Sequence, residues 1–286
     1  MTRIDAHHHV WDPARRDHAW LTEPGMDPIH RGFSASDLAP LAEAAGIERT
    51  VLVQVLPDVG ETEEFLALAA GSELIGGVVG WVDLTAPDIA DVLARLAEGP
   101  GGDRLVGIRH LVQGEADPAW LNRPDVRRGL RAVGAAGLRY DLLTLPHQLP
   151  AAIDTVRALP EVGFVLDHLS KPPIAVRELE PWAGRIRELA AEPNVCCKLS
   201  GMVTEAALVG SPGGDGWTVA MLRPYAETVL EVFGPERLMF GSDWPVCLLA
   251  ASYAEVVGAA EELVAGLSPA ERERVFGGTA ADFYGL

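Results

Sequence analysis

Lysine and cysteine are both scarce in this chain of 286 residues. Among its 23 basic residues only Lys171 and Lys198 are lysines, so each stands out as a candidate for a specific role. The cysteines, Cys196, Cys197 and Cys247, are too few and too irregularly spaced for a disulfide framework or a C-x-x-C zinc site. We expect them to be small core residues of a protein from the reducing cytoplasm.

Positive charge, long apolar runs and a nucleotide-binding loop are also lacking. With 23 basic against 41 acidic residues the formal net charge is −18, which argues against nucleic acid as a partner. No apolar run approaches the roughly 18 residues of a membrane span, and the N-terminus lacks a signal-peptide core, so we expect no membrane association. No G-x-G-x-x-G follows the first apolar segment, which disfavours a dinucleotide site. A small-molecule partner is expected, and assembly into a homo-oligomer stays open.

Eight short segments rich in valine, isoleucine and leucine alternate with amphipathic stretches along the chain. Such segments are typical of buried parallel strands, and eight strand–helix pairs typically need about 250 residues. The pattern predicts an α/β fold, a single (β/α)8 TIM-type barrel over residues 1–286, with a doubly wound sheet as the alternative. The predicted strands are 3–9, 50–55, 77–83, 105–111, 138–143, 163–169, 194–201 and 238–243.

Helical spacing is clear between several of these strands. Residues 87–98 and 124–136 carry apolar side chains three and four positions apart, and a glycine follows each stretch. Ser36 is expected to cap the helix that precedes the second strand. Two connections, 10–35 and 202–217, are unusually long. Because both follow strands, we expect them at the active-site face of the barrel, where loops can act as lids.

Three histidines in a row end the first predicted strand. Alternate residues of a strand share a face, so His7 and His9 should point together into the barrel and His8 toward the helices. Asp5 has the same parity as His7 and is expected one layer deeper, as a buried hydrogen-bonding partner. The pair His7 and His9 then lies at the carboxyl end of its strand, where TIM-barrel active sites are found.

Two later strands end in matching polar residues. His168 closes the sixth strand in LDHLSKP, and Asp243 closes the eighth in MFGSDWP. Taken singly, His168 is also consistent with a core histidine and Asp243 with a helix cap. An aspartate there is costly to bury unless it is hydrogen-bonded or bound to a metal. Together with His7 and His9 they converge on one mouth of the barrel, which predicts a four-residue site.

The motifs DAHHHVWD, LDHLSKP, KLSG and FGSDWP, in this order along nearly the whole chain, resemble the amidohydrolase superfamily. Within it the chain is most similar to the amidohydrolase-2 branch and its sugar-lactone hydrolases, such as L-fuconolactonases and L-rhamnonolactonases. PHQLP at 146–150 also resembles that group. The resemblance implies a hydrolase that opens the ring ester of a small lactone.

The same resemblance bears on cofactors. Many superfamily members bridge two metals through a modified lysine on a middle strand, and strands 105–111 and 138–143 contain neither lysine nor glutamate. A binuclear site is therefore not expected. The resemblance implies one divalent metal, zinc or manganese, held by four residues, or catalysis without any metal. Those four candidate ligands are His7, His9, His168 and Asp243.

Lactone opening needs an activated water, a polarised carbonyl and a proton for the leaving oxygen. Asp243 is the expected general base, while the three histidines stabilise the oxyanion directly or through a metal. Lys198 has an equally good alternative, a buried ion pair with an acid such as Asp141. His110 is expected to be structural, because it points away from Arg109. The expected substrate contacts are Arg109, Lys171, Lys198, His147 and Trp244.

Two other functions remain open at this point. A metal-dependent nonoxidative decarboxylase of the same fold would use the same histidines and aspartate. A non-catalytic barrel that binds a ligand is the second alternative, because a fold by itself does not imply activity. The four converging polar residues argue against it, since a scaffold has no need for them.

Overall fold

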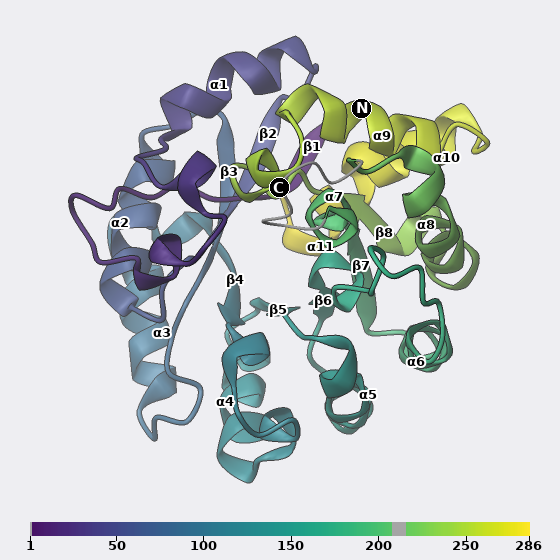
Figure 1. Ribbon diagram of the computed structural model, residues 1–286. Coiled ribbons are helices and arrows are strands. Elements are labelled where there is room, and N and C mark those ends of the chain that lie inside the picture. Colours follow the sequence, from purple (N-terminus) through teal and green to yellow (C-terminus); the bar gives the residue numbers. More distant parts are fainter. Residues whose placement is uncertain (1, 208–215) are drawn as a thin grey trace.

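The computed structural model describes residues 2–207 and 216–286, and its parallel strands form a barrel in simple sequence order (Figure 1). Each strand pairs in parallel with the next one along the chain. The strand β1 meets the segment after β8 through hydrogen bonds from Asp243 N to His7 O (2.8 Å) and from His9 N to Trp244 O (2.7 Å). The predicted (β/α)8 barrel is confirmed. Its strands are β1 (Ile4–His8), β2 (Arg49–Val53), β3 (Ile75–Gly80), β4 (Leu105–His110), β5 (Arg139–Leu142), β6 (Phe164–Leu166), β7 (Val195–Leu199) and β8 (Leu238–Phe240).

Helices surround this ring of strands, as Figure 1 shows for α1 to α6 and α8. Within the described residues, no helix is both long enough and apolar enough to cross a membrane. The α-helices are α1 (Ala35–Ala44), α2 (Val59–Ala70), α3 (Ile89–Glu98), α4 (Pro124–Ala135), α5 (Leu149–Ala158), α6 (Trp182–Ala190), α7 (Met202–Ala206), α8 (Val219–Phe233), α9 (Tyr253–Leu263), α10 (Pro269–Glu273) and α11 (Thr279–Tyr284).

The boundaries of α1 differ from the prediction. Ser34, not Ser36, is the N-cap, because its backbone N–H and its hydroxyl both bond the carboxylate of Asp37 at 2.8 and 2.6 Å. Ser36 instead lies within the first turn. Of the predicted long connections, 10–35 contains two short 3-10 helices, at Ala19–Thr22 and Asp27–Ile29. The other, 202–217, begins with α7 and then enters 208–215, which lie outside the described residues.

The barrel has two apolar layers. The larger one lies between the strands and the helices, and the smaller one fills the lumen. The helix α11 contributes Ala280 and Tyr284 to the lumen cluster, so the C-terminal segment packs against the strands from inside the ring. The side chains of the strands in this cluster are Ile4, Ala6, Val51, Val53, Val79, Val165 and Met239.

A β-bulge in β1 decides which of its side chains face the lumen. Asp5 pairs with Thr50 but His8 pairs with Leu52, so β1 has one residue more than β2 over this interval. Asp5 therefore does not share the face of His7, and the parity prediction for it is wrong. Its carboxylate accepts hydrogen bonds from Ser242 N (2.8 Å) and from the hydroxyl of Tyr253 (3.1 Å), the first residue of α9. Its predicted role as a buried hydrogen-bonding partner is confirmed.

Candidate active site

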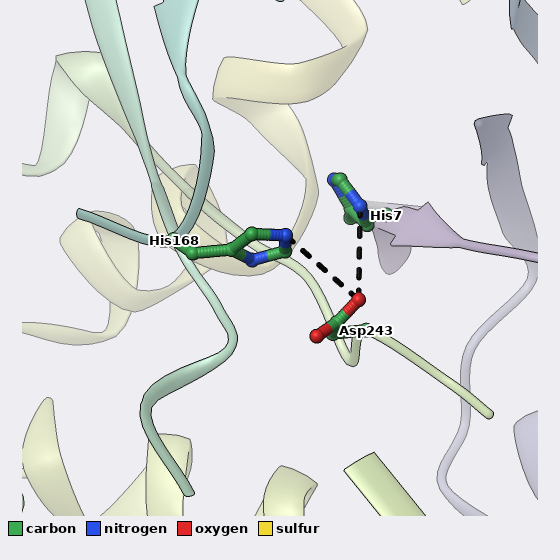
Figure 2. Close-up of side chains that lie close together, drawn as sticks. All are labelled: His7, His168 and Asp243. Atoms are coloured by element: carbon green, nitrogen blue, oxygen red, sulfur yellow. Dashed lines mark ion pairs between the residues drawn. The ribbon is translucent and has the colours of Figure 1, made fainter. Parts of the chain in front are cut away.

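The four residues predicted to form one site lie together at the carboxyl end of the barrel. The Nε2 atoms of three imidazoles surround Oδ1 of Asp243, at 3.4 Å for His9 and 3.8 Å for both His7 and His168. The two histidines of β1 are also close, with Nε2 atoms 3.2 Å apart. Figure 2 shows His7, from β1, and His168, from the turn after β6, pointing at Asp243. All four side chains are buried, with at most 5% of the residue exposed.

The imidazoles of His9 and His168 are each oriented by a polar partner at Nδ1, on the side away from Asp243. Nδ1 of His9 is 2.8 Å from the carbonyl oxygen of Val53, so it donates there and leaves Nε2 unprotonated in the neutral ring. Nδ1 of His168 is 2.9 Å from the hydroxyl of Ser200, which can act as donor or acceptor. Burial lowers the pKa of His9 and lowers that of His168 to about 4. Both rings are therefore neutral at pH 7, with Nε2 turned toward Asp243.

Asp243 is ionised despite being buried. Burial disfavours its charged form, but His168, His9 and His7 together hold the pKa of the carboxyl below the ordinary aspartate value. Its backbone is in the left-handed region, with φ of 57°. A non-glycine residue in this conformation is uncommon and concentrates at functional sites.

The backbone that presents His168 is also left-handed. Four residues in a row from His168 to Lys171 have φ between 50° and 59°. Two glycines from the predicted motifs make room for the imidazoles. A Cβ on Gly201 would lie 2.7 Å from Cγ of His168, and one on Gly241 would lie 2.7 Å from Cβ of His7. The motifs KLSG and FGSDWP therefore supply close backbone approach as well as polar groups.

His7, His168 and Asp243 are close enough together to hold one divalent metal, and His9 lies next to them. In a tetrahedral zinc site with bonds of about 2.0–2.1 Å, neighbouring donor atoms lie about 3.3 Å apart. Nε2 of His7 and Nε2 of His9 lie 3.2 Å apart, and the three Nε2 atoms lie 3.4–3.8 Å from Oδ1 of Asp243, which is comparable with that spacing. His7, His168 and Asp243 also form a trio whose nitrogen and oxygen atoms lie within 4.8 Å of one another. Neutral imidazoles with an ionised carboxylate are the forms that bind such an ion.

A charged network lies beneath His7, and its central member, Asp167, was not predicted from the sequence. Asp167 is fully buried, with Oδ2 3.1 Å from NH1 of Arg109 and Oδ1 3.1 Å from Nζ of Lys198. Burial disfavours ionisation of Asp167, but Lys198, His7 and Arg109 hold its pKa well below the usual range. The one sequence feature that could have indicated Asp167 is its position next to His168 in LDHLSKP. Strand alternation, however, predicts that the two side chains point in opposite directions.

Arg109 and Lys198 lie in this network. The guanidinium of Arg109 is 3.3 Å from Nε2 of His7 and donates through Nε to the amide oxygen of Gln54 at 3.0 Å. Lys198 pairs with Asp141 at 2.5 Å, so the predicted buried ion pair is confirmed. Both cations lie beside His7, and Gln54 is a further neighbour that no sequence pattern singled out.

Three other predicted contacts lie around the cluster at different depths. Lys171 is partly exposed, 3.9 Å from the carboxylate of Glu205 at the end of α7. Burial raises the pKa of Glu205, which Lys171 opposes and the nearby Asp243 reinforces. His147 is exposed in the 3-10 turn Pro146–Gln148 that follows β5. Trp244 is only 1% exposed and packs edge-on against Phe33, so it supports the loop behind Asp243.

The remaining histidines of the strands have structural surroundings. His8 is fully buried, and neither ring nitrogen has a hydrogen-bond partner within the described residues. Burial lowers its pKa to about 3, so the ring is neutral. His110 accepts from the indole N–H of Trp81 at 3.0 Å and stacks on Trp120 with ring centroids 4.4 Å apart. This agrees with the prediction that His110 is structural.

The model of the family described as Amidohydrolase matches residues 4–286. The chain belongs to the amidohydrolase family. It is 40% identical to an L-fucono-1,5-lactonase of Burkholderia ambifaria over 286 residues, which cover 99% of this chain and 95% of that protein. An L-fucono-1,5-lactonase of Burkholderia multivorans is likewise 40% identical, over 99% of this chain and 96% of its own. The family membership inferred from the motifs is confirmed.

A solved structure gives the same relationship in three dimensions. An amidohydrolase from Burkholderia multivorans, crystallised with bound zinc, is similar to this chain with a TM-score of 0.90 and 40% identity, over 100% of both chains. The amidohydrolase described here has a buried cluster of three neutral imidazoles and one carboxylate. Such a cluster can hold a divalent metal, take a proton from water and stabilise negative charge on an oxygen.

Proposed function

We propose that this amidohydrolase hydrolyses the ring ester of a small sugar (aldono) lactone. The observation that carries the proposal is the arrangement of His7, His9 and His168 around an ionised Asp243. The full-length identity of 40% to two L-fucono-1,5-lactonases supports the choice of a lactone as substrate. A lactone carbonyl needs a nucleophilic water, a partner for the oxyanion and a proton for the ring oxygen, and this cluster can provide all three.

Asp243 is the general base of the proposed reaction. Its carboxylate takes a proton from the attacking water as the new C–O bond forms, and returns that proton to the ring oxygen as the ester bond breaks. A carboxylate whose pKa is held low is a weak base, so the water must itself be made more acidic. A divalent metal held by the three histidines and Asp243, zinc or manganese, would supply that acidity and polarise the carbonyl.

The residues around the cluster would orient the lactone. Lys171 and His147 lie at the mouth of the barrel and would donate hydrogen bonds to ring hydroxyl or carboxyl oxygens. Arg109 lies deeper, beside His7, where its fixed charge favours a developing oxyanion. Glu205 would hold the ammonium group of Lys171 in position and would not itself contact the lactone.

The test is a pH-indicator assay of ring opening over a panel of 1,4- and 1,5-aldonolactones that includes L-fucono-1,5-lactone. Asp243→Asn should lower kcat by at least roughly 10³-fold, because the amide cannot take the proton. Asp154→Asn, an exposed aspartate on α5, is the matched control and should keep wild-type activity. Full activity of Asp243→Asn, with an unchanged circular dichroism spectrum, would refute the assignment.

Metal content and the rival reaction are measured on the same preparation. Chelation should remove the ion, as counted by elemental analysis, together with most of the lactonase activity. Added zinc or manganese should restore both. Release of carbon dioxide from hydroxylated aromatic acids, without turnover of any lactone, would instead favour a decarboxylase.

A further inference from the structure

The ammonium group of Lys198 lies at the centre of three acceptors from three other strand regions. Its Nζ is 2.5 Å from Oδ2 of Asp141, 3.1 Å from Oδ1 of Asp167 and 3.1 Å from Nδ1 of His7. All four side chains are completely buried. Acceptors arranged around one buried positive charge in this way resemble the ligands of a bound cation more than an ordinary surface ion pair.

The three acceptors also satisfy the spacing of a metal site. One ligand atom from each of His7, Asp141 and Asp167 lies within 4.8 Å of the other two. Oδ1 of Asp167 is buried and lies 3.1 Å from Nζ of Lys198 and 3.4 Å from Nδ1 of His7. Two buried carboxylates with an imidazole suit a divalent cation such as Mn²⁺. The group that now meets them is the side chain of Lys198.

We propose that Lys198 is the resident cation of a site formed by His7, Asp141 and Asp167, and that it keeps a divalent metal out of this position. The ammonium compensates the two buried carboxylates, which would otherwise repel each other without a counter-ion. It also contacts Nδ1 of His7 from below, on the side away from Asp243. The position beneath His7 is therefore filled by the side chain of Lys198.

This inference goes beyond the proposed function and does not depend on it, because occupancy of the lower position is measured without any substrate. Tyr284 would remain in place when Lys198 is shortened. Its hydroxyl donates to both carboxylate oxygens of Asp141 at 2.9 Å and holds that side chain from the C-terminal helix. Truncation at Cβ would free the volume of the propylammonium group (Cγ to Nζ) for an ion and its water ligands.

The test compares Lys198→Ala with Lys198→Met. Both variants lose the positive charge, but only alanine opens space, because methionine is nearly as long as lysine. Each protein is stripped with chelator and then dialysed against Mn²⁺. Bound manganese is counted by elemental analysis, and Tm is measured with and without the ion. Lys198→Ala should bind one equivalent more than the wild type and show a larger rise in Tm with Mn²⁺.

Lys198→Met should bind no additional manganese and gain no additional Tm from it. Adding Asp141→Asn to Lys198→Ala should abolish the extra equivalent, which separates this position from the cluster around Asp243. Recovery of folded Lys198→Ala in Mn²⁺ but not in chelator would also support the proposal. A folded Lys198→Ala with the manganese content of the wild type would overturn it, as would a Lys198→Ala that stays unfolded in saturating Mn²⁺.

Discussion

Gly201 makes room for the imidazole of His168, and its replacement by alanine is a direct test of how the site is held. The residue has φ of +66°, a conformation that side chains with a Cβ rarely adopt. An added Cβ would lie 2.7 Å from both Cγ and Nδ1 of His168 and 2.8 Å from its Cβ. Real Cβ atoms essentially never approach this closely, so either the imidazole or the loop must move.

The cost has two parts. A non-glycine residue in the left-handed region costs about 1–2 kcal/mol, and overpacking a dense interior costs typically about 1–3 kcal/mol. The sum of about 2–5 kcal/mol corresponds to a decrease in Tm of roughly 5–15 °C for a protein of this size. Movement of the ring also disrupts the contact of 2.9 Å between Nδ1 of His168 and the hydroxyl of Ser200. A displacement of about 1 Å can lower kcat about 100-fold.

Gly137→Ala is the matched control. Gly137 follows α4 and has φ of +78°, but a Cβ there would meet nothing within 4 Å. Its replacement should cost only the backbone term, about 1–2 kcal/mol, and leave turnover unchanged. Urea unfolding and lactone turnover of the two variants separate strain from crowding. If Gly201→Ala were as stable as Gly137→Ala and fully active, the close approach to His168 would have no importance for the site.

Two further predictions concern buried groups outside the catalytic cluster. Burial raises the pKa of Glu61 to about 7 from 4.5, while the backbone N–H groups of Leu56 and Val55 oppose the shift. The folded protein holds this proton more tightly than the unfolded chain, so its stabilising contribution is complete below about pH 4.5 and is lost as the pH rises through 7. Between pH 5 and 8 the wild type should therefore lose about 2–3 kcal/mol more in urea unfolding than Glu61→Gln, and equal losses would contradict the assignment. Tyr284→Phe removes the hydroxyl that donates to Asp141 and should lower the free energy of unfolding by about 1.5–3 kcal/mol, measured by urea unfolding. A decrease below about 0.5 kcal/mol, the lower end for a neutral hydrogen bond, would show that Asp141 is satisfied without this hydroxyl.

Local sequence patterns were sufficient for the architecture. Eight apolar segments alternate with amphipathic ones, and burial on both faces of a parallel strand leaves a run of valine, isoleucine and leucine that is visible without a structure. The ends of elements were less predictable. Ser34 caps α1 in place of Ser36. The residue three positions after Ser34 is Asp37, whose carboxylate accepts a hydrogen bond from the Ser34 hydroxyl.

The main residues of the site were also predictable, since strands that end at the same edge of a barrel bring their last side chains together. His7, His9, His168 and Asp243 occur in this pattern. The structure places Nε2 of each of the three histidines within 3.8 Å of Oδ1 of Asp243. Of their supporting residues, Lys198 with Asp141 was predicted, but Asp167 and Gln54 were not. Asp167 is adjacent to His168, and alternation would place the two on opposite faces, but the left-handed turn that starts at His168 cancels that rule.

The sequence alone therefore determined the order of strands and helices, the family and the four residues at the mouth of the barrel, because each depends on short-range periodicity or on motif order. Tertiary structure decided which faces those residues take and what surrounds them. A single extra residue in β1 turns Asp5 toward α9 while His7 keeps the lumen. The contact of Lys198 with Asp141, Asp167 and His7 joins strands up to 191 positions apart. Such contacts follow from closure of the barrel, in which side chains distant in the chain must share one buried volume and balance their charges there.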